Sequence, residues 1–157
     1  MPKRPLKAAI ATSGLTRALK DGSVHPNGLD LECPSIDWIV PAMRSMVREA
    51  RYDIAEMAFG TYLCAKAFNY PFIAIPIFLT RNFHHTAIVF NVHSGITSPK
   101  DLEGRNVAVN RGYTVTTGLW ARGMLQSEYG VNLKKITWFP TDDEHVEEYQ
   151  TPLNVDY

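Results

Sequence analysis

Residues 98–123, SPKDLEGRNVAVNRGYTVTTGLWARG, decide how this chain of 157 residues is interpreted. The stretch predicts a short helix, a turn, a buried strand, a loop at 110–113 and a second helix that begins at 114–117. The first N–H groups of a helix have no intrahelical partner and carry partial positive charge. A strand that leads into such a helix points these groups beyond its own C-terminal end, where an anion can bind.

The predicted loop and helix start bring hydroxyls, free amides, a guanidinium and an aromatic ring close together in sequence. Such a set suits a small aromatic or aliphatic carboxylate, because charge-assisted hydrogen bonds hold carboxylates strongly. The candidate substrate-binding residues in this stretch are Arg111, Tyr113, Thr114, Thr116 and Thr117. The alternative is that the threonines only cap the helix.

Start and stop signals bound the first helix of the stretch. Ser98 suits the N-cap, Pro99 suits the first helical position, and Gly104 suits the residue just past the helix end. These signals predict a helix of about one and a half turns.

Strand and helix patterns alternate along the rest of the chain. Strands are predicted at residues 7–11, 29–33, 52–57, 72–75, 86–92 and 135–139, with helices at 38–51 and 60–68. Helices between strands imply an α/β fold with parallel strands. Ligands of such sheets gather outside the C-terminal ends of the strands, so Ser13, Gly60 and Thr61 join the candidate binding residues.

Composition excludes several classes of function. The chain is 45% hydrophobic and 20% charged, and its 16 basic residues balance 16 acidic ones, so neither nucleic acid nor a membrane is an expected partner. The only cysteines, Cys33 and Cys64, predict free buried thiols rather than a disulfide framework or a zinc finger. The sequence lacks P-loop, dinucleotide and serine-hydrolase motifs, so no cofactor and no metal are predicted.

The two ends of the chain bear on targeting and on metal binding. Residues 1–14 lack the long apolar core of a signal peptide, which favours a cytoplasmic location, or a periplasmic one if the true N-terminus is missing. Residues 141–157 are acidic and lose periodicity, and His145 stands within the acidic run. This pattern predicts a solvated surface segment rather than a metal site.

Several motifs carry a family resemblance. The clearest are RNFHHT at 81–86, SPKDLEG at 98–104 and EYGV at 128–131, and further matches lie at 21–31, 52–63 and 118–125. In their order and spacing, from about residue 9 to residue 138, they resemble the 4,5-dihydroxyphthalate decarboxylase family. That family shares its fold with type 2 periplasmic binding proteins and with the substrate-binding proteins of transporters.

The resemblance implies two α/β lobes with a ligand cleft between them. The first lobe would cover residues 1–88, and residues 89–157 would form a partial second lobe. Because family members are much longer, the resemblance implies an N-terminal fragment, and one alternative is that this fragment does not function independently. Beyond a small aromatic or organic carboxylate, the implied partner is the missing C-terminal half or a second copy of the chain.

The resemblance also implies a reaction, the decarboxylation of a hydroxylated aromatic acid of the phthalate type. His85 matches the family's histidine and is the predicted proton donor, and Arg81 would clamp a carboxylate. His84 stands where the family has an arginine and is predicted to contact substrate, while residues 110–112 replace a proline-glutamate loop, which indicates another substrate. The alternatives are that these histidines are ordinary loop residues and that the chain is a non-catalytic substrate-binding protein for a small organic acid.

Overall fold

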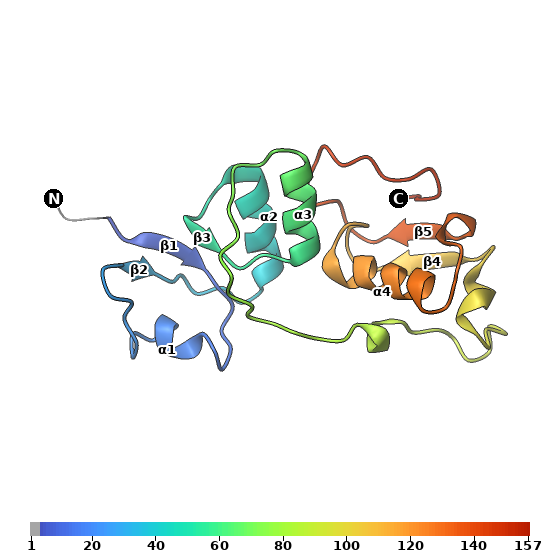
Figure 1. Cartoon of the computed structure of the whole chain (residues 1–157), viewed down its shortest axis with the longest axis horizontal. Helices are drawn as coiled ribbons and strands as arrows, with labels where there is room; N and C mark the ends of the chain where they lie inside the picture. Colours follow the sequence, from blue (N-terminus) through green and yellow to red (C-terminus); the bar gives the residue numbers. More distant parts are fainter. Residues whose placement is uncertain (1–3) are drawn as a thin grey trace.

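Two small parallel sheets lie toward opposite ends of an elongated molecule in the computed structural model, which describes residues 4–157 (Figure 1). The first sheet has the order β2-β1-β3, and the second pairs β4 with β5. The five strands are β1 (Leu6–Ala9), β2 (Leu31–Glu32), β3 (Ile54–Ala55), β4 (Asn106–Val109) and β5 (Thr137–Pro140). The parallel α/β arrangement that the sequence predicts is therefore confirmed.

The first sheet is covered by the long amphipathic helix α2 (Ile39–Glu49), which packs on β1 and β3. Apolar residues three and four positions apart, such as Val40, Met43 and Val47, are buried on its inner face. The helix α1 (Arg17–Lys20) follows β1, and α3 (Phe59–Ala67) follows β3. The helix α3 lies beside α4 (Thr116–Ser127), so it connects the first sheet with the second (Figure 1).

The second sheet supports the main hydrophobic core. Its two strands pair from Asn106–Thr137 to Val109–Pro140, and a parallel bridge joins Trp138 to Val155. Two 3-10 helices, η2 (Pro99–Leu102) and η3 (Leu133–Lys135), contribute to this core together with α4 and both strands. The buried core residues lie in these elements or next to them: Leu102, Val109, Leu125, Val131, Ile136 and Trp138.

The short helix predicted at 98–104 is confirmed as η2. The Asp101 carboxylate accepts hydrogen bonds from the backbone N–H groups of Thr97 and Ser98, both at 2.8 Å. These bonds lower the pKa of Asp101 to about 2. Gly104, with φ +80°, takes the left-handed conformation that ends the helix.

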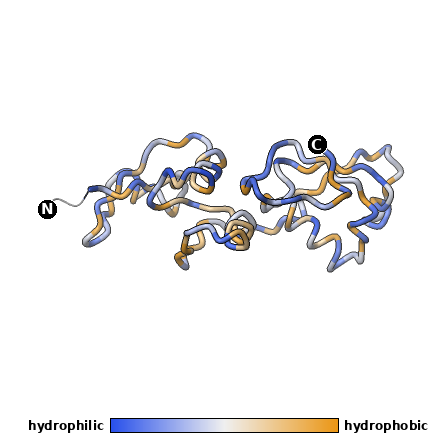
Figure 2. Tube along the Cα trace, turned by 90° about the horizontal axis from the view of Figure 1, so that it is seen from above, coloured by the Kyte–Doolittle hydropathy of each residue, from blue (hydrophilic) through white to orange (hydrophobic). Residues whose placement is uncertain are grey.

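The strands predicted at 72–75 and 86–92 are wrong. Residues 71–84 form no regular element, and the 3-10 helix η1 (His85–Ala87) stands where the second of these strands was expected. The exposed fractions of Ile73, Phe83 and Val89 are 90%, 89% and 87%. A strand needs a hydrogen-bonded neighbour, and no segment within residues 4–157 pairs with these. Figure 2 shows hydrophobic residues spread along the whole trace rather than gathered in one part of it.

Three further expectations concern the whole chain. The lobe boundary at residues 88 and 89 stays a prediction, and residues 1–3 of the first predicted lobe lie outside the described part. Cys33 and Cys64 are free as expected, although each is half-buried rather than fully buried. Within residues 4–157, no helix has both the length and the apolar character needed to span a bilayer.

Candidate anion-binding site

The loop that joins β4 to α4 packs closely against the residues that follow β5. Arg111 takes a left-handed conformation, with φ +71°, and its N–H donates a hydrogen bond to Thr141 Oγ1 at 2.8 Å. Its guanidinium lies 5.6 Å from the centre of the Trp38 ring. Gly112 allows the close approach, because a Cβ there would lie only 2.8 Å from the carbonyl oxygen of Asp143.

Two loop residues just before α4, Tyr113 and Thr114, hold a carboxylate, that of Glu144, whereas the helix predicted to bind an anion at its start begins only at Thr116. Glu144 Oε1 accepts a hydrogen bond from the Tyr113 N–H, and Oε2 accepts from the Thr114 N–H at 3.0 Å and from the Thr114 hydroxyl. The Tyr157 hydroxyl donates to Oε1 at 3.0 Å. Glu144 is only 8% exposed. We call the donors of Tyr113 and Thr114 the anion cradle.

A buried arginine lies behind the anion cradle. Arg122, 4% exposed, donates a hydrogen bond to the Tyr113 carbonyl, and its guanidinium stacks 3.5 Å from the centre of the Tyr113 ring. Burial lowers the pKa of Arg122, while the negative charge of Glu144 acts in the opposite direction. Its Nη1 atom has no hydrogen-bond partner in the part of the chain that the structure describes. The cradle is therefore backed by positive charge.

His145 lies beside the cradle and is almost completely buried, with 1% of its surface exposed. Its Nδ1 lies 3.1 Å from Thr61 Oγ1 near the start of α3, and Nε2 finds no partner among residues 4–157. Burial, together with the positive charges of Arg44 and Arg48, lowers the pKa of His145. The ring is therefore held neutral between α3 and the cradle.

Arginines of α2 hold the acidic residues around Glu144. Arg44 pairs with Asp142 at 2.6 Å, and Arg48 donates to Asp143 at 2.6 Å and to the Glu144 carbonyl at 2.6 Å. The hydrogen bond from Arg44 lowers the pKa of Asp142 to about 2. The prediction of a solvated surface segment is thus wrong for residues 144–146, which are buried. The sequence pattern missed this because the arginines that pair with the segment come from a distant helix.

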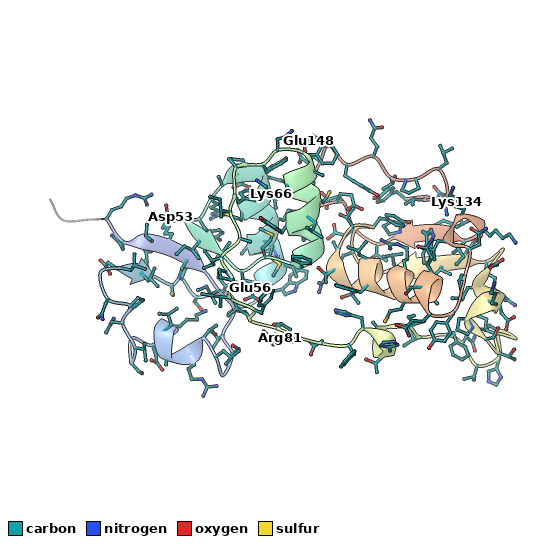
Figure 3. All side chains as sticks on the ribbon, in the orientation of Figure 1. Asp53, Glu56, Lys66, Arg81, Lys134 and Glu148 are labelled. Atoms are coloured by element: carbon teal, nitrogen blue, oxygen red, sulfur yellow. The ribbon has the colours of Figure 1, made fainter. Side chains whose placement is uncertain are left out.

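A groove of about 530 Å³ opens next to the cradle between α3 and α4. Its apolar walls include Leu63 and Phe68 of the α3 region and Leu119 of α4, and Thr114 of the cradle also lines it. The other lining residues are Gly60, Cys64, Ala67, Glu148, Tyr149 and Gln150. The two helices approach closely at Gly60, where a Cβ would lie 2.9 Å from Leu119 Cδ2 of α4 and equally close, at 2.9 Å, to the Thr114 carbonyl oxygen just before it. In Figure 3, the labelled Glu148 of the C-terminal segment lies beside the end of α3 that carries Lys66.

Comparison with known proteins places this architecture in a family. A family model for the periplasmic phosphonate substrate-binding proteins of ABC transporters matches residues 40–151, which include both the cradle and the groove. The chain belongs to this substrate-binding family. The type 2 periplasmic-binding-protein fold predicted from the sequence is therefore confirmed.

Two curated relatives of this family member are 4,5-dihydroxyphthalate decarboxylases, which confirms the resemblance read from the motifs. The protein from Comamonas testosteroni is 34% identical over 139 residues, covering 88% of this chain and 42% of the relative. The protein from Pseudomonas putida is 33% identical over 139 residues, covering 88% of this chain and 53% of the relative. The chain spans about half the length of these curated relatives.

The structure of this family member brings together one group of the predicted site residues. Gly60 donates its N–H to Thr116 Oγ1 at 3.4 Å, Thr61 contacts His145, and Tyr113 and Thr114 form the cradle. Arg111 is adjacent in the loop, and Thr117 follows in the first turn of α4. The N-terminal ends of α3 and α4 thus lie together, as the strand–helix pattern predicts.

The remaining predicted residues lie elsewhere. Ser13 stays in the loop after β1, where its hydroxyl lies 3.1 Å from that of Thr16. Arg81 lies on the extended segment between the two sheets, 5.3 Å from the centre of the Phe78 ring (Figure 3), and the half-buried His84 precedes η1. His85 Nε2 lies 3.2 Å from Glu128 Oε2, just beyond the end of α4.

The separation along α4 matters for catalysis. Thr116 and Glu128 are about 18 Å apart at 1.5 Å per residue, so His85 lies at the opposite end of the helix from the cradle. The catalytic roles of His85 and Arg81 therefore stay predictions.

Three residues of the site were not identified from the sequence: Arg122, Glu144 and His145. Only the alternation within DEHVEE offered a signal, because a valine and a histidine inside an acidic run are unusual for a fully solvated segment. Among the described residues, no three His, Cys, Asp or Glu side chains gather as a metal site would require.

Proposed function

We propose that this chain binds the carboxylate of a hydroxylated aromatic acid at the anion cradle and that the protein decarboxylates this acid. The observation that supports the binding site is the Glu144 carboxylate, which the cradle already holds through two backbone N–H groups and a hydroxyl. The reaction is inferred from the two relatives named 4,5-dihydroxyphthalate decarboxylase.

The groove suits the rest of such a substrate. Its volume of about 530 Å³ is in the range of small-molecule sites, and Leu63, Phe68 and Leu119 offer apolar surface to an aromatic ring. Glu148 and Gln150 at the groove provide polar partners for ring hydroxyls. A carboxylate at Thr114 and a ring between α3 and α4 would therefore both be accommodated.

The reaction places three demands on the protein. A proton is first added to the ring carbon that carries the carboxylate. A hydroxyl ortho or para to the carboxylate then provides the electron sink for the electron pair that CO₂ leaves behind. The protein must hold the carboxylate, supply a proton and exclude water. The cradle meets the first demand in this proposal. His85, the predicted proton donor, lies at the opposite end of α4 from the cradle, and the buried His145 lies beside the cradle in contact with Thr61.

A second candidate function is binding of a small organic acid without chemistry. The matching family model favours it, because that model describes substrate-binding components of transporters. Fold does not separate the two functions, since one fold serves both binding and catalysis.

The test combines calorimetric binding with detection of CO₂. The 157-residue chain, its Glu144→Gln variant and its Thr114→Val variant are titrated with 4,5-dihydroxyphthalate, and Thr80→Val serves as an exposed control. Because Glu144 uses the Thr114 hydroxyl in the parent chain, Thr114→Val is compared in the Glu144→Gln background. We expect it to weaken binding there about tenfold, because it removes a hydroxyl bonded to a charged group, and Thr80→Val to leave binding unchanged. Absence of binding in both the parent chain and Glu144→Gln would overturn the proposal. CO₂ release supports the decarboxylase, whereas binding without release supports the second candidate.

A further inference from the structure

We infer that Glu144 is a displaceable internal ligand of the anion cradle, so that a substrate carboxylate binds only as the Glu144 carboxylate leaves. This inference rests on the proposed function, because it concerns the same cradle. It makes Glu144 the residue that sets the affinity and the charge selectivity of the site.

The cradle has room for only one carboxylate. Both of its backbone N–H groups and the Thr114 hydroxyl are already donated to Glu144. A backbone N–H provides a single donor. Two carboxylates side by side in the cradle would also repel each other strongly, because burial limits the screening of their charges. A second carboxylate therefore cannot join Glu144 in the cradle and has to replace it.

The structure offers Glu144 a place to go. A second hollow, of about 270 Å³, lies against the same side chain and is lined by Arg48, Asp143, Glu144, Glu147, Tyr149 and Tyr157. Arg48 already donates to the Glu144 carbonyl at 2.6 Å, so its guanidinium is within reach of a carboxylate that swings out of the cradle. The exchange moves the carboxylate from the neutral donors of the cradle to a guanidinium that also pairs with Asp143 and Glu147. It breaks no strand pairing, because Glu144 lies outside β4 and β5.

The charge behind the cradle makes the exchange selective. Arg122 is buried, which lowers its pKa, and the negative charge of Glu144 acts in the opposite direction. Removing Glu144 without replacing its charge would leave this guanidinium without a nearby anion, at a large cost in desolvated charge. An anionic ligand restores the balance and a neutral one does not, so phthalate should displace Glu144 and phthalamide should not.

The experiment measures phthalate affinity by calorimetry in four proteins: the parent chain, Glu144→Gln, Tyr157→Phe and the control Glu32→Gln. Glu144→Gln keeps the size of the internal ligand and removes its charge, so we expect phthalate to bind about tenfold tighter or more. Tyr157→Phe removes one donor that holds Glu144 without altering the cradle, and about threefold tighter binding is expected. Glu32→Gln makes the same charge change on the exposed strand β2 and should leave affinity within about twofold.

The outcomes separate this inference from the proposed function. Equal or weaker phthalate binding by both Glu144→Gln and Tyr157→Phe would overturn the inference, while the proposed function stands if Thr114→Val still weakens binding. If neither the parent chain nor Glu144→Gln binds, the proposed function fails first. Should Glu144→Gln not fold, as judged by its thermal melt, Tyr157→Phe decides alone. Binding of phthalamide as tight as that of phthalate would also count against displacement by charge.

Discussion

The acidic segment at residues 141–149 and the apolar segment at residues 71–92 are buried in the opposite order to their hydropathy. At the centre of the acidic segment, Glu144, His145 and Val146 are 8%, 1% and 0% exposed. In the apolar segment, Ile73 and Phe83 are 90% and 89% exposed. The available partners, and not composition alone, therefore decide which segment is buried.

The acidic segment has a partner for its buried carboxylate, Glu144, and for the more exposed carboxylates beside it. The cradle donors bind the Glu144 carboxylate, and the arginines of α2 bind Asp142 and Asp143. Burial of a charge is tolerated when opposite charge and hydrogen bonds replace the water that it loses. The segment therefore joins α2, α3 and α4.

The apolar segment has hydrophobic side chains but no strand to pair with among residues 4–157. Its backbone forms only local bonds, such as the N–H of Ile77 to the carbonyl of Ile75 at 2.7 Å. An exposed apolar stretch of this kind is typical of a surface that is covered in an assembly or by another segment.

The largest effect is expected from breaking the contact of the acidic segment with the cradle loop. Gly112→Ala would place a Cβ 2.8 Å from the Asp143 carbonyl oxygen and 3.1 Å from Glu144 Cα. We expect the free energy of unfolding to fall by about 2 kcal/mol, because backbone on one side and helix start on the other leave no room to relax. Urea unfolding measures this loss.

The matched control is Gly123→Ala on the exposed face of α4, where no atom lies within 4 Å of the new Cβ. Alanine favours a helix, so this variant should gain about 0.5 to 1 kcal/mol. An equal response of the two variants would show that the acidic segment is not tightly docked.

A smaller effect is expected from pH, through His145. Because burial lowers the folded-state pKa, the unfolded chain takes up this proton first as the pH falls below about 6.5. The stabilisation from the neutral ring is thus fully present above that pH and is lost below it, with a slope approaching about 1.4 kcal/mol per pH unit from this group. Unfolding curves between pH 7.5 and pH 5 measure the slope.

His145→Gln removes the titrating group and keeps a partner for Thr61, so its stability should depend less on pH than that of the parent chain. The exposed His93→Gln serves as the control and should leave the slope unchanged. If His145→Gln kept the full slope, the histidine would not be buried in solution as it is here.

The smallest effect is expected in the apolar segment. Phe83→Ser removes a large ring that is 89% exposed, so the free energy of unfolding should change by less than about 0.5 kcal/mol. The same substitution at a buried aromatic residue would cost several times more. A loss above about 2 kcal/mol in urea unfolding would mean that the segment is packed and that the contrast between the two segments does not hold.

Local patterns predicted the elements that depend on near neighbours in sequence. The caps around Pro99, the three- and four-residue spacing in α2 and the threonine-rich start of α4 gave the right element in each case. These features are determined by turn chemistry and by periodic burial within a few residues.

Elements that depend on distant partners could not be predicted in this way. Val89 has strand propensity, but a strand forms only where another strand pairs with it. The burial of Glu144 required Thr114, which is thirty residues away, and the docking of Asp143 required Arg48, which is ninety-five residues away. No pattern in the sequence links these positions.

The hydrogen bond from Tyr157 to Glu144 gives the molecule an optical reporter of its own. Partial burial of the hydroxyl and the negative charge of Glu144 raise the pKa of Tyr157 to about 12. A tyrosinate absorbs ultraviolet light differently from a tyrosine, so the ionisation of this one ring can be followed as a difference from the Tyr157→Phe protein. When Glu144 swings away, the ring should ionise at lower pH, and its absorbance then reports whether the cradle holds the protein's own carboxylate or one from solution.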